Sequence, residues 1–529
     1  MSADPPIPAP PADASGSPVR ARSRIARNVA SNWATTVVTL LSTLFITPLV
    51  VSALQRELYW VLSFLVGLLS YADLLYLGLG GAFVRGVAMC RAGGKQAELN
   101  RLASVVFFIY LVLGTVSLAV FGSLGWFVDH VFAQPLSAEA TASIAAACAL
   151  LGVQLFLNFV SSSFAGILYG SDRIDLINAV RIAVILGRAA AIVLWIDGAH
   201  PLVILPSITA GFTALEASAM ALIVHGVDGR LRVRPVVPSR AELAPLYSFG
   251  LKSFAIVFAT TLINYTDTTV VGVMLGAASV AVYTLPLQLV EYVRVLAIGA
   301  SSALLPRLAV LVHDGDWAGL REAYLRGTRV VLFLASFATA QLFTLGPAFL
   351  AIWVGPEFGA KVHGVIICLG TAALLHVFAV VVPYTFYQAM DRMGTPARIL
   401  VIEAVANAVL SVALAPWLGI LGVAIGTLVP AIAASAVLLP AYFRRLLSVP
   451  TRDVLAAVLP SAALIVVVVL TQWVAGAAIG SASYLELAAR VTVTVGPVLL
   501  VFWLGFPRED RLWVVNAMRR VAGHRSLPE

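Results

Sequence analysis

The chain has 529 residues, of which 60% are hydrophobic and only 11% are charged. Soluble domains carry about 25% charged residues, so this composition excludes an ordinary soluble protein and indicates a membrane protein. A net charge of +8 can indicate nucleic-acid binding. Here the basic residues are dispersed over many short segments, so we expect them to set membrane topology, and we expect no nucleic-acid partner.

The basic residues divide the chain into a regular pattern. Seven apolar stretches of 45 to 71 residues lie between blocks of Lys and Arg, and each can hold two helices of about 20 residues. Because Lys and Arg mark cytoplasmic loops, we predict an all-α polytopic protein with about 14 transmembrane helices and both termini in the cytoplasm. Eight blocks contain 29 of the 34 basic residues: Arg20–Arg27, Arg85–Arg101, Arg173–Arg181, Arg230–Lys252, Arg307–Arg329, Arg392–Arg398, Arg444–Arg452 and Arg508–Arg525.

In chain order, the first segment is rich in Pro, Ala and Ser and then becomes basic, which predicts a disordered cytoplasmic tail. Six transmembrane helices follow, then the longest basic loop, then six more helices, two additional helices and a cytoplasmic C-terminal tail. The predicted organisation is therefore a tail (1–28), an N-lobe (29–226), a cytoplasmic linker (227–250), a C-lobe (251–445), two further helices (446–507) and a C-terminal tail (508–529).

Two segments of the first half recur in the second half. Ala82-Phe-Val-Arg85 with the following Gly93-Gly94 pair is similar to Leu305-Pro-Arg307 with Gly315, so the two arginines lie 222 residues apart. Asp172-Arg173 recurs 219 residues later as Asp391-Arg392. Repeats with an even number of spans share one orientation, which predicts two lobes related by an axis along the membrane normal.

Three motifs resemble those of a known family. Asp267-Thr-Thr-Val-Val-Gly-Val-Met-Leu-Gly resembles its seventh span, Leu77-Gly-Leu-Gly-Gly-Ala-Phe-Val-Arg85 the end of its second span, and Leu305-Pro-Arg307 with Gly315-Asp316 its eighth-to-ninth loop. On these motifs the chain resembles the polysaccharide-lipid flippases (Wzx type) of the multidrug/oligosaccharidyl-lipid/polysaccharide exporter superfamily. The resemblance covers roughly residues 28 to 445.

The resemblance implies two six-helix bundles around a central cavity that opens alternately to each side. It also implies a cargo, an undecaprenyl-pyrophosphate-linked oligosaccharide moved from the cytoplasmic to the periplasmic leaflet for surface polysaccharide such as O-antigen or exopolysaccharide. The expected location is the bacterial inner membrane. Expected partners are the lipid-linked oligosaccharide and membrane lipids, with a polysaccharide polymerase and a chain-length regulator as further candidates.

Four arginines are candidates for binding an anionic cargo. Arg188 lies within an apolar span, where a charge costs about 2.5–3.5 kcal/mol on insertion scales, and its planar guanidinium could bind pyrophosphate bidentately; a structural Arg paired with an acid is the alternative. Arg294 could line the cavity or simply neutralise Glu291 three residues away. Arg85 and Arg181 could receive a headgroup at the inner interface, although topology alone also explains them.

Four acids are candidates for ion coupling. Asp267 lies in a span beside threonines and could titrate near neutral pH if it is isolated from water; a carboxylate held by hydroxyls and an Arg is the alternative. Glu291, Glu216 and Glu403 are further candidates. His376 could carry a proton or be a hydrogen-bonded structural residue.

The runner-up function is a multidrug or small-molecule cation antiporter of the same superfamily, which would need acids in the cavity. A membrane glycan polymerase or ligase is a third alternative, although the predicted outer turns are short. We find no nucleotide-binding Gly-rich motif and no metal-ligand spacing at Cys90, Cys148 and Cys368. We therefore expect no cofactor and no enzymatic activity.

Overall fold

The computed structural model describes residues 18–76, 79–127, 138–196, 200–302, 304–359, 362–390 and 392–521, and every regular element in these ranges is helical, which confirms the all-α prediction. The N-terminal helices are α1 (Pro18–Ser70), α2 (Leu79–Ala92), α3 (Gln96–Leu124), α4 (Ala138–Gly170), α5 (Ile174–Trp195) and α6 (Pro201–Val227). The remaining α-helices are α7 (Arg240–Val270), α8 (Ala277–Ser302), α9 (Leu305–His313), α10 (Trp317–Trp353), α11 (His363–His376), α12 (Val382–Ala389), α13 (Gly394–Ala431), α14 (Leu439–Leu447), α15 (Thr451–Ala475), α16 (Tyr484–Gly505) and α17 (Arg508–Val521). Short 3-10 and π segments are η1 (Tyr71–Tyr76), η3 (Val271–Leu275), η4 (Pro356–Phe358), η6 (Val377–Val381) and η7 (Ile432–Leu438).

Eleven helices in the described residues are long and apolar enough to cross a membrane. One of them, Gly394–Leu447, is 54 residues long and is interrupted at Gly419, whose φ of 58° and ψ of −141° are not helical. It therefore holds two crossings. Adding the second leg of α1 and helix α7, which is 31 residues long, gives the 14 crossings predicted from the basic blocks.

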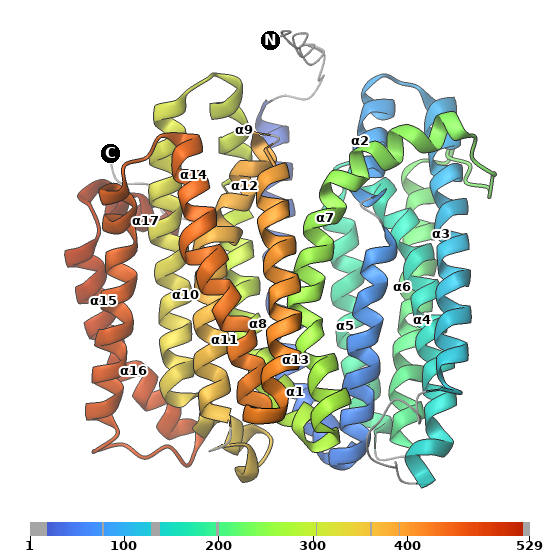
Figure 1. Ribbon diagram of the computed structural model, residues 1–529. Coiled ribbons are helices and arrows are strands. Elements are labelled where there is room, and N and C mark those ends of the chain that lie inside the picture. The colour runs from blue at the N-terminus through green and yellow to red at the C-terminus, as the bar shows by residue number, and fades with distance from the viewer. Residues whose placement is uncertain are drawn as a thin grey trace.

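Helix α1 folds back on itself. Ser42 and Leu69 line the same cavity, although a straight helix would separate them by about 40 Å at 1.5 Å per residue. The chain therefore reverses between them, and Figure 1 shows the two legs as separate blue helices. The 53 residues of α1 thus account for the first two expected crossings.

The turns that join corresponding helices of the two halves have the same hydrogen bonds. Lys95 N–H donates to the Cys90 carbonyl at 2.9 Å, and Asp316 N–H donates to the Leu311 carbonyl at 2.9 Å. Both turns contain a glycine with positive φ, Gly94 at 64° in the first and its counterpart at 67° in the second. This conformation carries no steric cost for glycine. The sequence repeat is therefore also a repeat of backbone structure.

The two halves lie side by side and share one large core. Figure 1 shows α2–α6 on one side, α8–α17 on the other, and α1 and α7 near the boundary. One buried apolar cluster joins both halves: Leu54, Phe121, Leu151, Ile196 and Leu205 belong to the first half, and Val280, Tyr283, Leu369, Ala415 and Val423 belong to the second. Towards the other end, each half has a core of its own. The large shared core therefore lies at one end, whereas at the other end smaller contacts join the halves, such as Leu246 of α7 in the core of the first half.

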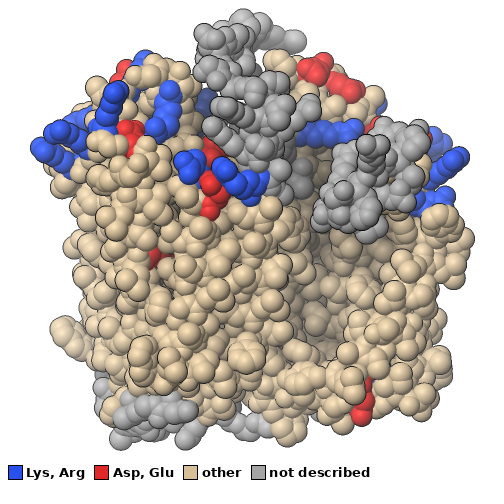
Figure 2. All heavy atoms as spheres, turned by 180° about the vertical axis from the view of Figure 1, so that it is seen from behind, with Lys and Arg blue, Asp and Glu red and all other residues tan. Residues whose placement is uncertain are grey.

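The opposite end carries the basic residues. Figure 2 shows Lys and Arg gathered in a band at the top of the molecule, above a broad zone almost without charge. Helix α1 begins at this end and α17 lies there too (Figure 1). We call it the basic end and the other, where the shared core lies, the far end. The uncharged zone between them is the surface expected for a protein surrounded by lipid.

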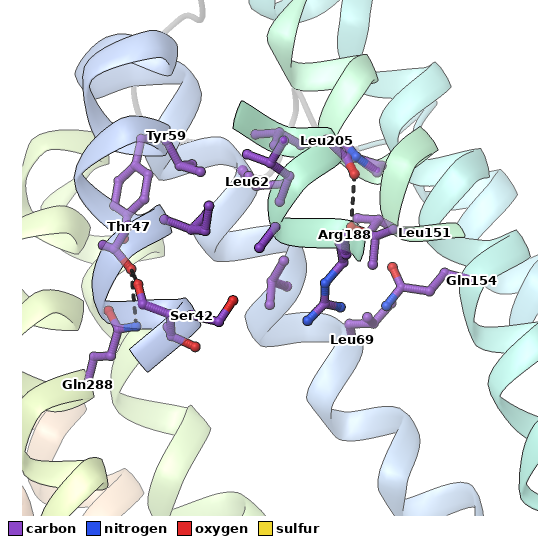
Figure 3. Close-up of a pocket in the computed structure, with 18 residues that line it drawn as sticks. Ser42, Thr47, Tyr59, Leu62, Leu69, Leu151, Gln154, Arg188, Leu205 and Gln288 are labelled. Atoms are coloured by element: carbon purple, nitrogen blue, oxygen red, sulfur yellow. Dashed lines mark hydrogen bonds between the residues drawn. The ribbon is translucent and has the colours of Figure 1, made fainter. Parts of the chain in front are cut away.

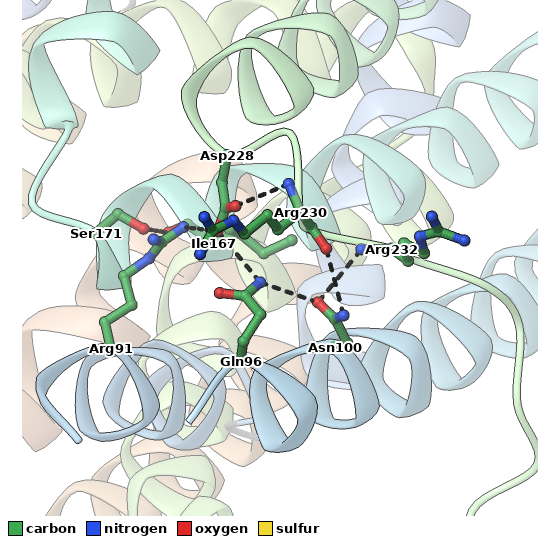
Figure 4. A network of polar contacts seen from close by, with 8 residues as sticks. All are labelled: Arg91, Gln96, Asn100, Ile167, Ser171, Asp228, Arg230 and Arg232. Carbon is green, nitrogen blue, oxygen red and sulfur yellow. Dashed lines mark hydrogen bonds and ion pairs between the residues drawn. The ribbon is translucent and has the colours of Figure 1, made fainter. Parts of the chain in front are cut away.

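The segment between the halves is fastened to the first half. Residues 228–239 have no helix, and α7 already begins at Arg240. Asp228 forms an ion pair of 3.3 Å with Arg91, and Asn100 donates to the Arg230 carbonyl and accepts from the Arg232 N–H (Figure 4). Of the predicted N-terminal tail, residues 1–17 lie outside the described residues, whereas helix α1 begins at Pro18.

The last three helices pack against the outside of the second half. α15 packs on α10, and α16 packs on α15. At the basic end, Asp510 of α17 is buried and forms an ion pair of 2.8 Å with Arg326 of α10, beside a second contact with Arg329. Burying three charged groups together fastens α17 to the bundle, because each charge has a partner.

Candidate functional site

A cavity of about 350 Å³ lies in the first half beside the shared core, and Gln288 of α8 is its one lining residue from the second half. Helices α1, α4, α5, α6 and α8 line it. Its polar side chains are hydroxyls and amides: Ser42, Thr43, Thr47, Gln154, Thr209 and Gln288. Three of the hydroxyls donate to carbonyls of their own helices at 2.7–2.9 Å. Their oxygen lone pairs therefore face the cavity as acceptors.

Arg188 supplies the only formal charge among the residues that line this cavity. It lies about 21 Å along α5 from the basic end, at 1.5 Å per residue. The preceding residue, Gly187, packs against Phe212 of α6 so closely that a Cβ there would lie 2.6 Å from the ring. Because successive helical residues are rotated by about 100°, Arg188 points away from that contact and into the cavity, towards Gln154 and Leu69 (Figure 3). Among the described side chains, no hydrogen bond or ion pair within the usual limits satisfies its guanidinium.

The other three candidate arginines lie elsewhere. Arg181 forms an ion pair of 3.6 Å with Glu216 and donates to the Tyr169 hydroxyl at 3.1 Å. Arg294 forms a bidentate pair with Glu291, at 2.7 and 2.8 Å. Two candidate acids, Glu216 and Glu291, are therefore neutralised by candidate arginines. For Glu291 this is the alternative stated above, in which Arg294 simply neutralises it. Arg181, Glu216, Arg294 and Glu291 are all absent from the residues that line the cavity around Arg188.

Arg85 lines a second cavity, of about 660 Å³, at the basic end between α2, α3 and the start of α7. Its walls are mostly apolar, and Arg101 and Glu242 lie at its edge. These two form a bidentate pair at 2.6 and 3.0 Å. Glu242 also caps α7 by accepting from the Ser239 N–H. The contacts with Arg101 and Ser239 lower the pKa of Glu242 to about 2.

Asp267 lies in a separate, closed polar site of the second half. It is 2% exposed and accepts hydrogen bonds from three hydroxyls: Tyr283 of α8 at 2.6 Å, Ser411 of α13 at 3.1 Å, and Thr427 of α13. No described arginine contacts it. Asp267 is therefore a carboxylate held by hydroxyls, but the hydroxyls come from α8 and α13 rather than from its neighbours on α7.

The hydroxyls around Asp267 have a second acceptor within reach. Ser411 and Thr427 each lie 3.3 Å from the Val423 carbonyl. A hydroxyl donates one proton, so each can donate either to Asp267 or to that carbonyl. The site can thus satisfy an ionised carboxylate with three donors, and it can also satisfy a protonated one that donates in its turn.

Glu403 and His376 form a further buried pair in the same half. The His376 Nε2 lies 2.6 Å from Glu403 Oε1, and the glutamate side chain is only 2% exposed. Both residues were singled out in the sequence, but separately, because they lie on α13 and α11. The packing of α11 on α13 brings them together.

Ser411 and Thr427 were not predicted from the sequence, and Tyr283 stands out there only as the end of the motif that begins at Asp267. The packing of α7 against α13 places Ser411 and Thr427 beside Asp267, and the turn between α7 and α8 brings Tyr283 there. One pattern in the sequence does point to the polar face of α13. Glu403, Asn407 and Ser411 are spaced by four residues, which puts three polar side chains on one face of an apolar helix.

The fold and the cavity define the class of the protein. Many apolar helices, two repeated halves and an internal cavity, together with the family match below, point to a multi-pass membrane protein of the transporter class. Residues 25–312 match the family model described as "Polysaccharide biosynthesis protein". Because this match covers more than half of the chain, the chain belongs to that family, and the resemblance noted in the sequence is confirmed.

Solved structures with the same fold are transporters. An inward-facing multidrug resistance MATE family transporter of the MOP superfamily is similar with a TM-score of 0.64 and 17% identity, over 78% of this chain and 98% of that one. A MOP superfamily transporter from Pyrococcus furiosus gives 0.60 and 16%, over 82% and 96%. The lipid II flippase MurJ, in an inward closed conformation, gives 0.59 and 13%, over 86% and 97%. No curated protein matches the sequence.

Proposed function

We propose that the protein flips an undecaprenyl-pyrophosphate-linked oligosaccharide from the cytoplasmic to the periplasmic leaflet of the bacterial inner membrane, by alternating access. The observation that carries this proposal is the cavity itself, in which the guanidinium of Arg188 is the single charge among the lining residues and Glu216 of α6 interacts with it from outside the lining. A guanidinium binds phosphate oxygens bidentately. The hydroxyl and amide groups around it suit sugar hydroxyls, and the family description and a structural relative named as a lipid II flippase agree with this cargo.

The orientation follows from the charge distribution. Lys and Arg are retained on the cytoplasmic side during insertion, so the basic end and both termini face the cytoplasm. The shared core then seals the cavity on the periplasmic side, and the separate cores of the two halves lie on the cytoplasmic side. In this arrangement the cargo headgroup enters from the cytoplasmic leaflet while its lipid tail stays in the membrane.

The positive charge of the cavity argues against a multidrug cation antiporter, the runner-up function. A multidrug cation antiporter needs acids where its cargo binds, because a buried cation requires a partner. The lining residues include no Asp or Glu. The four candidate acids, Asp267, Glu291, Glu216 and Glu403, all lie outside the cavity.

Asp267 is proposed as the ion-coupling residue. Its three hydroxyl donors and the alternative acceptor at Val423 let it exist with or without a proton. Asp267 lies on α7 and is hydrogen-bonded to α8 and α13, so a change in its charge alters contacts among three helices of the second half. Such a change can bias the equilibrium between two packed arrangements.

A reconstituted flipping assay tests the function. Purified protein in vesicles that contain a fluorescent undecaprenyl-pyrophosphate-linked oligosaccharide is expected to move the label across the bilayer, and Arg188→Ala is expected to stop this movement. A fluorescent cationic dye in the same vesicles is the comparison. Transport of the dye without transport of the glycolipid would favour the antiporter instead.

A further inference from the structure

Helix α13 carries a line of buried polar side chains on one face. Glu403, Asn407 and Ser411 are spaced by four residues, and their exposures are 3%, 1% and 0%. Residues at this spacing lie one above another on a helix. Burying three polar groups in an apolar bundle is costly, so a stripe of this kind indicates a function for the face that bears it.

The two ends of the stripe contact different titratable groups. At one end, Ser411 donates to Asp267, and Asn407 donates at 2.9 Å to Thr427, which contacts Asp267 as well. At the other end, Glu403 Oε1 lies 2.6 Å from His376 Nε2. The stripe therefore connects the Asp267 site with the His376–Glu403 pair through a single turn of α13.

Two oxygens in the middle of the stripe have no partner among the described residues. They are Glu403 Oε2 and Asn407 Oδ1, one helical turn apart and both buried. Both are acceptors, since the Asn407 amide nitrogen already donates to Thr427. A water molecule has two O–H groups and can donate one to each oxygen, which is how buried waters usually satisfy such atoms.

The stripe also has a direction. Helices α7 and α13 both begin at the basic end, and Glu403 lies about 14 Å along α13 from its start, whereas Ser411 lies about 26 Å along it. Moving from Asp267 to Glu403 therefore leads towards the basic end. The His376 side chain is more exposed than that of Glu403, 14% against 2%. It also immediately precedes the π segment η6, an irregularity common at functional sites.

We propose that His376, Glu403 and a water held between Glu403 Oε2 and Asn407 Oδ1 form a proton path from Asp267 towards the basic end. The proposal rests on Asp267 being the coupling residue, and it identifies the coupling ion as a proton. In the first two steps one O–H bond breaks as another forms, and in the last an O–H bond of Glu403 breaks as an N–H bond of His376 forms. Asp267 gives a proton to the water, and the water gives a proton to Glu403 Oε2. The carboxylic acid rotates so that its O–H faces Nε2 of His376 and passes that proton to it; His376 becomes an imidazolium ion and Glu403 returns to a carboxylate.

Few other ionisable groups surround this path in the described residues. Tyr283 of α8 contacts Asp267, and Tyr384 of α12 packs in the apolar cluster around Leu400 and Ala404 of α13. Arg398 is exposed near the start of α13. The path is thus enclosed by apolar side chains, which keep bulk water from bypassing it.

Proton movement is tested with the purified protein in vesicles. Glu403→Gln keeps the size of the side chain but removes the titrating group, and His376→Gln does the same for the imidazole. Both variants are expected to lose acceleration of glycolipid flipping by a pH gradient while they retain its slow equilibration without a gradient. Glu291→Gln, at the exposed pair on α8, is the matched control and is expected to keep the acceleration.

Infrared difference spectra between acid and neutral pH give a second readout that does not need the cargo. The wild-type protein is expected to show a protonated carboxylic acid band that Glu403→Gln loses. An unchanged band and unchanged gradient dependence in both variants would overturn the path. If a sodium gradient rather than a pH gradient accelerates flipping, and Glu403→Gln removes that effect, the same two oxygens hold a cation and the proton path is wrong.

The two proposals fail in different ways. If the wild-type protein moves no glycolipid at all, the proposed cargo is wrong, whereas the infrared band still tests whether Glu403 takes up a proton. If glycolipid moves and only the gradient dependence is missing in the wild type, the cargo stands and the coupling is wrong. Thermal unfolding of each variant, together with Glu403→Asp as a variant that restores the carboxyl group, separates loss of the path from loss of the fold.

Discussion

The Tyr283 hydroxyl donates a hydrogen bond of 2.6 Å to Asp267 Oδ2. The two residues lie on opposite sides of the π segment η3 and of Gly276, whose φ is 78°. The bond therefore closes the turn between α7 and α8, while Ser411 and Thr427 fasten the same carboxylate to α13. A single buried carboxylate thus holds together three helices of the second half.

Loss of that bond is expected to destabilise the protein. Tyr283→Phe leaves a buried carboxylate oxygen with one donor fewer, at a cost of about 1–3 kcal/mol. We expect a lower unfolding temperature in detergent and weaker gradient dependence of transport. Tyr442→Phe, an aromatic side chain of α14 that is not fully buried, is the control. Equal unfolding temperatures for Tyr283→Phe and the wild type would show that the hydroxyl contributes nothing.

Replacement of the carboxylate separates coupling from assembly. Asp267→Asn keeps a polar group that can accept from the surrounding hydroxyls but cannot change its charge. We expect a folded, membrane-inserted protein whose transport no longer responds to an ion gradient. The response is measured in vesicles with and without the gradient, and an unaltered response would exclude Asp267 as the coupling residue.

Arg188 is expected to be required for cargo binding. Arg188→Ala should abolish surface polysaccharide while the protein stays in the membrane, and Arg188→Lys should restore only part of it, because an ammonium group cannot bind pyrophosphate bidentately. Arg452→Ala, at a side chain that is 87% exposed, is the control. Immunoblots of membranes and of surface polysaccharide provide the measurement, and normal polysaccharide from the Arg188→Ala protein contradicts the assignment.

The start of α7 is expected to depend on pH through Glu242. Its pKa falls from 4.5 to about 2 through contacts with Arg101 and Ser239, so this stabilisation is complete above about pH 4.5 and is lost as the pH falls towards 2. The protection factors for hydrogen exchange of residues 240–243, which correct for the intrinsic pH dependence of exchange, should therefore stay high at pH 5 and fall in stronger acid. Glu242→Gln should exchange quickly already at neutral pH, and slow exchange in that variant would show that the carboxylate is not the cap.

Asp510 is expected to hold α17 in place. Asp510→Ala leaves Arg326 and Arg329 partly buried without a carboxylate, and breaking a buried ion pair costs about 3–5 kcal/mol. We expect easier proteolysis after α16 and a lower unfolding temperature. Asp453→Ala, at an exposed ion pair on α15, should change neither. Equal protease resistance of the two variants would show that α17 is held by other contacts.

The sequence by itself determined the membrane class, the crossings, the repeat and the pairing of Glu291 with Arg294. These properties depend on composition, on the positions of Lys and Arg and on spacing within one helix, all of which are local. It also singled out Arg188, Asp267, His376 and Glu403 as charged or titratable groups in apolar helices, because such groups are costly wherever they lie.

Only the tertiary structure decided what these groups contact. Arg188 faces a cavity because Gly187 packs against Phe212, and Arg181 pairs with Glu216 because α5 lies beside α6. Asp267 meets Ser411 144 residues away along the chain. An apolar helix in lipid can present any face to its neighbours without losing hydrophobic burial. Its rotation is therefore set by packing against other helices, and no periodicity within one helix encodes it.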